Sequence, residues 1–151
     1  MKIFNTTIKV LSTKTMILLT LFLYIHTINA QDNNYIYGTW TFSDGPSFSR
    51  MSLDIKQHTD TIPGLKAEIL SAYTGRRMTF SPNGDFEQSM ASGERLFGKW
   101  AIIGNVLELY DPQGNSYSLL IGEIKSNRLV LIPPTSNDAR PILPELYFTK
   151  N

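Results

Sequence analysis

Residues 98–124 have the sequence GKWAIIGNVLELYDPQGNSYSLLIGEI, and this stretch decides the fold class. It contains three apolar or alternating runs. Gly104-Asn105 separates the first two runs, and residues 111–115 separate the second from the third. A two-residue connection of this kind matches the twist of paired antiparallel strands, so neighbouring runs are expected to form hairpins. The stretch therefore predicts an antiparallel meander in which each strand pairs with the next.

Similar runs recur on both sides of this stretch, with turn signals about every 8 to 12 residues. Ser81-Pro82-Asn83-Gly84, for example, has proline and glycine at positions that favour a hairpin turn. We predict an all-β fold, a small antiparallel meander β-barrel of about eight or nine strands. The predicted strands are Tyr35–Phe42, Phe48–Gln57, Arg76–Phe80, Asp85–Met90, Arg95–Ile103, Val106–Tyr110, Ser116–Ile124, Arg128–Ile132 and Glu145–Thr149.

One segment departs from the strand period of two. Between Thr61 and Gly75 the apolar residues recur at intervals of three and four, which is typical of an amphipathic helix. Pro63 suits the first turn of a helix, Asp60 or Thr61 could cap it, and Gly75 suits a left-handed position beyond its end. We predict a single helix over residues 63–73, after the second strand. It should cover one end or face of the barrel through Leu65, Ile69, Leu70 and Tyr73.

The first thirty residues are typical of a secretory signal peptide. Lys2, Lys9 and Lys14 precede the apolar run 16–25, and Ala30 is followed by a polar stretch. The run is shorter than the roughly 20 residues that a membrane-spanning helix needs. We predict cleavage after Ala30, which leaves residues 31–151 as one barrel domain. No cysteine is present to carry a lipid anchor, so the product is expected to be exported, to the periplasm or the medium, without one.

Charge and composition exclude several classes of function. The 14 basic residues less the three lysines of the leader leave 11, against 13 acidic residues. A mature chain of about −2 without a basic stripe lacks the footprint of a nucleic-acid-binding protein. The absence of cysteine excludes a disulfide scaffold and a thiolate metal site.

Chemistry-bearing residues are sparse, so we expect neither an enzyme nor a bound cofactor or metal. His58, the one histidine after the leader, lies in a polar stretch that is typical of a solvated loop. No serine lies in a Gly-x-Ser-x-Gly elbow, the carboxylates are scattered, and no calcium-loop spacing occurs. Arg76 and Arg77 could clamp an anion at the barrel mouth. The favoured interpretation is that one of them caps the last carbonyls of the helix while the other is solvated.

The two tryptophans share a local motif that carries a family resemblance. They occur in Gly38-Thr39-Trp40 and Gly98-Lys99-Trp100, each at the start of a predicted strand. With the segments 72–86 and 146–150, this order resembles the lipocalin-like proteins exported by Bacteroidetes-type bacteria. The resemblance implies that the first indole closes the barrel floor, and that the protein binds a small apolar molecule or has a structural role. The chain departs from larger lipocalins in its short length and in having no helix after the last strand.

Strand alternation yields the candidate ligand-binding side chains of the barrel interior. We assign a structural role to Gly38, Trp40, Gly98 and Trp100, with each glycine allowing close packing against an indole that is mostly buried. An alternative is a protein-interaction barrel with a solid core and no ligand. An outer-membrane barrel is disfavoured because most of the predicted strands are shorter than about 9 residues. The candidate ligand-binding residues are Met51, Leu53, Met78, Phe80, Phe86, Met90, Tyr117 and Leu119.

Overall fold

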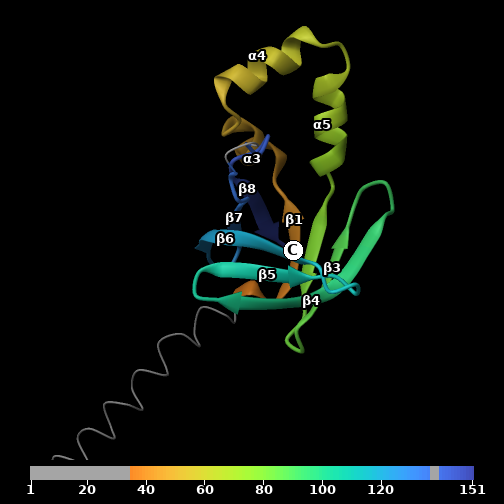
Figure 1. Cartoon of the computed structure of the whole chain (residues 1–151), viewed down its shortest axis with the longest axis vertical. Coiled ribbons are helices and arrows are strands. Elements are labelled where there is room, and N and C mark those ends of the chain that lie inside the picture. Colours follow the sequence, from red (N-terminus) through yellow and green to blue (C-terminus); the bar gives the residue numbers. More distant parts are fainter. Residues whose placement is uncertain (1–34, 137–139) are drawn as a thin grey trace, which may run out of the picture. The chain divides into compact units, whose positions relative to one another are not determined.

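The computed structural model describes residues 35–136 and 140–151, which belong to the compact unit Asn33–Asn151. The predicted signal peptide and its cleavage after Ala30 lie outside the described residues. Eight strands and three helices make up the described part of the chain (Figure 1). The strands are β1 Gly38–Phe42, β2 Arg77–Phe80, β3 Asp85–Ser89, β4 Arg95–Ile103, β5 Val106–Tyr110, β6 Ser116–Ile124, β7 Arg128–Ile132 and β8 Leu146–Lys150.

The strands form a closed barrel in sequence order, and every neighbouring pair is antiparallel. Consecutive strands form hairpins from β2 to β7, as the turn residues predict. The barrel closes where β1 pairs with β8, with Trp40 opposite Lys150 and Phe42 opposite Phe148. The predicted meander barrel is therefore confirmed, with eight strands.

The prediction fails between β1 and β2, where the chain is helical. The helices are α3 Asp44–Ser49, α4 Leu53–Thr61 and α5 Leu65–Tyr73. The predicted strand Phe48–Gln57 is therefore wrong, and so is the prediction of a single helix placed after the second strand. None of the helices in the described ranges is long and apolar enough to cross a membrane.

A helical period explains residues 48–57 better than strand alternation does. Met51 and Thr59 are buried and Ile55 packs on the core, so the inward positions are four residues apart. Leu53, which alternation places beside Met51, is 74% exposed. Ser52, in extended conformation directly before α4, and Asp54 in the first turn are ordinary signals of a helix start. Met51, Leu53 and Ile55 alternate as in a strand, but so short a run cannot distinguish the strand period of two from the helical period of 3.6.

Helix α5 lies within the predicted range 63–73 but begins two residues later. Gly64, in the left-handed region at φ +84°, is the residue before its first turn, so neither Asp60 nor Thr61 caps this helix. Gly75 follows the helix at φ +75°, as expected. Ile69 is buried, and Leu65 and Tyr73 pack against the core.

The barrel end that contains the tryptophans is densely packed. Trp40 is fully buried, and its indole Nε1 donates to the Ile36 carbonyl at 2.7 Å. Trp100 is half-buried, and its ring makes edge contacts with Tyr37 and Phe80 at centroid distances of 5.9 and 5.5 Å. At this end the interior is filled by side chains and the peptide that precedes β1.

The two glycines before the tryptophans have different surroundings. Gly98 lies against the backbone of β5, where any Cβ atom would overlap the Tyr110 carbonyl oxygen. Gly38 adopts a φ of +115°, and a Cβ there would lie 3.0 Å from Cε of Lys150. The tight packing at Gly98 is thus against a neighbouring strand, whereas the expectation was packing against an indole.

Candidate functional site

The barrel encloses a cavity of about 600 Å³ at the end opposite the tryptophans. Its wall comes from six strands and from the β5–β6 turn. The register directs Phe86, Leu96 and Leu109 inward, whereas the lining residues Arg95, Phe97 and Tyr110 lie on the opposite face of their strands. Tyr117 and Leu96, which are 59% and 48% exposed, mark where the cavity meets solvent. The lining residues are Arg76, Met78, Phe86, Gln88, Arg95, Leu96, Phe97, Leu109, Tyr110, Asp111, Pro112, Gln113, Tyr117, Leu119, Leu146 and Phe148.

Four of the eight candidate ligand-binding residues come together in this cavity. Met78 and Phe86 lie on adjacent strands β2 and β3, and Tyr117 and Leu119 lie on β6 across the barrel. The register pairs Leu109 with Tyr117 and Leu107 with Leu119, so both β6 side chains point the same way as the inner face of β5. The cavity therefore lies between β2 and β3 on one side of the barrel and β6 on the other, and strand alternation predicted these inward side chains.

The other four candidates lie elsewhere. Phe80 is 1% exposed and packs against Phe86 and Trp100 in the filled end of the barrel. Met51 lines a separate space of about 360 Å³ among the three helices. Leu53 is on the exposed side of α4, and Met90 lies beyond the end of β3, outside the barrel cavity. Met51 and Leu53 were misplaced because their segment is helical.

Sequence reasoning missed several lining residues. Leu109, Leu146 and Phe148 alternate on predicted strands, so their inward direction was accessible from the sequence. Which end of the barrel each one occupies depends on the strand register, which the sequence does not reveal. Alternation places Gln88 on the same face as Phe86, so its inward direction was accessible too, whereas the β5–β6 turn residues 111–113 gave no signal of lining a cavity.

A second cavity, of about 640 Å³, lies beside α4 and α5. It contains His58 and Glu68 from the two helices and Ile142 from the segment before β8. In Figure 1, α4 and α5 form an arch beyond one end of the barrel. His58, expected in a loop, is an exposed residue of α4.

Contacts at both ends of the arch fix its position. Near the barrel, Phe42 of β1, Phe48 of α3 and Tyr73 of α5 form an aromatic cluster with centroid distances between 5.6 and 6.4 Å. Farther out, the Arg140 guanidinium donates to the Asp54 carboxylate at 2.7 Å, which ties α4 to the segment that precedes β8. The arch is therefore held by the barrel wall and by this segment.

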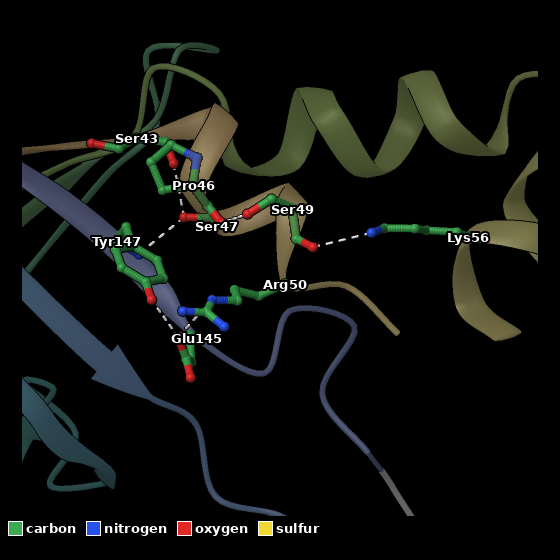
Figure 2. Close-up of polar contacts among 8 residues, drawn as sticks. All are labelled: Ser43, Pro46, Ser47, Ser49, Arg50, Lys56, Glu145 and Tyr147. Carbon is green, nitrogen blue, oxygen red and sulfur yellow. Dashed lines mark hydrogen bonds and ion pairs between the residues drawn. The ribbon is translucent and has the colours of Figure 1, made fainter. Parts of the chain in front are cut away.

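Helix α3 is anchored on β8 by a buried serine (Figure 2). The Ser47 hydroxyl donates to the Ser43 carbonyl at 2.8 Å and accepts the backbone N–H of Tyr147 at 2.9 Å. At the surface beside it, the Tyr147 hydroxyl donates to Glu145, and Arg50 pairs with the same carboxylate at 3.5 Å. Because Ser47 is fully buried, its two hydrogen bonds hold the helix against the strand without competition from water.

Arg76 lines both the barrel cavity and the cavity beside the helices. Its Nη2 donates to the Ala72 carbonyl at 3.0 Å, and its guanidinium carbon lies 4.6 Å from the centre of the Tyr73 ring. Burial lowers the pKa of Arg76, and the nearby Tyr73 opposes that shift. Arg77 is exposed. One arginine thus caps α5 while its neighbour is solvated, as the favoured interpretation held.

Comparison with known proteins gives little beyond the structure itself. No protein-family model matches the chain, and no curated protein matches it. Among solved structures the chain is similar to a DUF4847 family protein from Bacteroides vulgatus ATCC 8482. The TM-score is 0.46 at 16% sequence identity, over 80% of this chain and 96% of that chain. At this level of similarity, the fold assignment rests on the strand pairing.

Proposed function

We propose that the protein is an exported, lipocalin-like barrel that binds one small hydrophobic or amphipathic molecule in the barrel cavity. The observation that carries the proposal is the cavity itself. Its volume of about 600 Å³ lies within the usual range for ligand sites, about 300 to 1,000 Å³, and the buried residues of its lining are all apolar. The proposal is for a binding protein and not an enzyme. The pattern of residues 1–30 supports export.

Dye binding combined with a cavity-filling variant tests this proposal. A neutral environment-sensitive dye, N-phenyl-1-naphthylamine, should bind at near one per chain. Leu119→Trp places a larger side chain in the cavity, so dye affinity should fall about tenfold or more. Stability should change by less than the 1 to 3 kcal/mol that overpacking a solid core costs.

Met90→Trp is the matched control, because it introduces the same side chain outside the cavity. It should leave dye affinity within about threefold of the wild-type value. The proposal fails if the wild-type protein binds no dye. It also fails if Leu119→Trp destabilises the protein as strongly as overpacking a filled core would while dye affinity is unchanged.

A protein-interaction role is the second candidate function. It is favoured by exposed apolar side chains on and near α4. Leu53 and Ile62 of the α4 region are 74% and 42% exposed, and Ile142, which lines the cavity beside α4 and α5, is 38% exposed. A partner that docks on a free strand edge is disfavoured, because β1 and β8 pair and close the described barrel. Dye binding that is insensitive to Leu119→Trp but lost in Leu53→Asp would favour this second role.

A further inference from the structure

Arg76 lies in the short connection between α5 and β2, and its side chain also lines the barrel cavity. Met78, two residues later, lines the same cavity. Arg77, between them, is exposed on the outer face, as the alternation of a strand requires. Arg76 therefore adds a basic residue to the wall of an otherwise largely apolar cavity.

The charge of Arg76 is incompletely compensated. Ion pairs join Arg50, Arg95, Arg128 and Arg140 to carboxylates, and within residues 35–136 and 140–151 none joins Arg76 to one. Its Nε atom is buried without a hydrogen-bond partner, and the bond to Ala72 and the Tyr73 ring offset only part of the loss of hydration. A partly buried charge of this kind is less stable than one in water until an anion approaches it.

We propose that Arg76 is the counterion for the ligand's head group, and that the ligand is a single-chain amphiphile with a carboxylate head. This inference rests on the proposed function and specifies the chemistry of the ligand. The guanidinium would bind the carboxylate by charge-assisted hydrogen bonds, as arginine does in planar bidentate pairs. The apolar chain would lie along Phe86, Leu109 and Leu119.

The charged residues that line the two cavities favour binding of the ligand's head group in the barrel cavity. The cavity beside the helices contains Asp54, His58 and Glu68 in addition to Arg76; Asp54 is paired with Arg140, and the carboxylate of Glu68 would repel an anion there. The barrel cavity has one carboxylate in its lining, that of Asp111, together with Arg76; its other basic residue, Arg95, is paired with Glu87. Asp111 is itself bonded to the backbone and side chain of Asn115 within its own turn.

Two ligands that differ only in the head group test this inference. Calorimetric titration of the full-length protein with dodecanoate and with dodecanol should show dodecanoate binding about tenfold more tightly or better. Arg76→Met should reduce dodecanoate affinity about tenfold and leave dodecanol affinity within about threefold. The control Arg77→Met removes the same charge from the outer surface and should change neither affinity. Acetate, which has the head without the chain, should not compete at concentrations that saturate with dodecanoate.

The possible failures are distinguishable. Equal binding of the two ligands to the wild-type protein, or equal losses in Arg76→Met and Arg77→Met, would overturn the counterion role while leaving an apolar ligand site intact. Binding of neither ligand, together with no binding of the neutral dye, would overturn the proposed function itself.

A measurement on the wild-type protein keeps the inference testable if Arg76→Met does not fold. The carboxyl carbon of bound ¹³C-labelled dodecanoate should titrate at a pKa below that of monomeric dodecanoate in free solution, since a neighbouring guanidinium stabilises the charged form. A pKa raised above the free value would show an apolar environment without a counterion and would contradict the proposal. Arg76→Lys, which keeps the charge, should retain the preference for dodecanoate over dodecanol.

Discussion

Trp40 shows how a single side chain can close one end of the barrel. Its ring is fully buried, its Nε1 hydrogen-bonds to the Ile36 carbonyl, and the Lys150 ammonium lies 5.1 Å from its centre. We predict that Trp40→Ala lowers the free energy of unfolding by about 3 to 5 kcal/mol, because it removes a large buried side chain and leaves a cavity. Urea denaturation monitored by circular dichroism measures this loss.

Trp100→Ala is the comparison for Trp40, since its indole is half-buried and donates to the Ser81 carbonyl at 3.1 Å. Its cost should be smaller than that of Trp40→Ala, because less area returns to water. An unchanged denaturation midpoint in Trp40→Ala would mean that the indole does not close the barrel.

Ser47 is the residue on which the placement of α3 depends. Ser47→Ala should destabilise the protein by about 1 to 3 kcal/mol, because it leaves the partly buried N–H of Tyr147 without its acceptor. Ser49→Ala is the matched control. Ser49 is an exposed residue of the same helix whose hydroxyl bonds to the Pro46 carbonyl, so its loss should cost within about 0.5 kcal/mol. Equal effects of the two substitutions in thermal unfolding would contradict the anchoring role.

At the scale of elements, α5 packs through one buried face. Ile69 is 8% exposed and lies between the two spaces that flank α4 and α5. Ile69→Asp would place an unpaired charge there and should destabilise the packing of α5 by about 2 kcal/mol or more. Amide exchange of residues 65–73 should then accelerate by more than tenfold, while the strands remain protected.

Leu53→Asp is the control for Ile69→Asp, because the same change falls on a side chain that is 74% exposed. It should leave exchange in α5 unchanged. If both variants behave alike, the helical face assigned as buried is not the one that packs.

The elements also show where sequence reasoning succeeds and where it stops. The hairpins of residues 77–132 could be predicted because Gly104-Asn105 and similar turns determine both the connection and the pairing of their strands. The helical structure of residues 48–57 could not be predicted, because Met51, Leu53 and Ile55 fit a strand as well as a helix over so short a run. The helix at 65–73 was predictable because its apolar spacing extends over more than two turns.

For the whole molecule, the inward faces of the strands could be predicted and the cavity could not. Alternation identified Met78, Phe86 and Leu119 as interior, and all three line the cavity. Phe80, predicted by the same rule, packs in the filled end instead. Whether an inward side chain meets a neighbour or empty space depends on register and on strand bending, which are properties of the closed barrel.

The central claim is that the barrel cavity is the ligand site, and nuclear Overhauser effects between a bound neutral dye and protein methyl groups test it most directly. With methyl-labelled protein and N-phenyl-1-naphthylamine at one equivalent, the account predicts contacts to the methyl groups of Met78, Leu109 and Leu119, which line the cavity from three strands. Contacts only to Leu53, Ile62 and Ile142, the exposed methyl groups near the helices, would contradict it and place the binding surface outside the barrel.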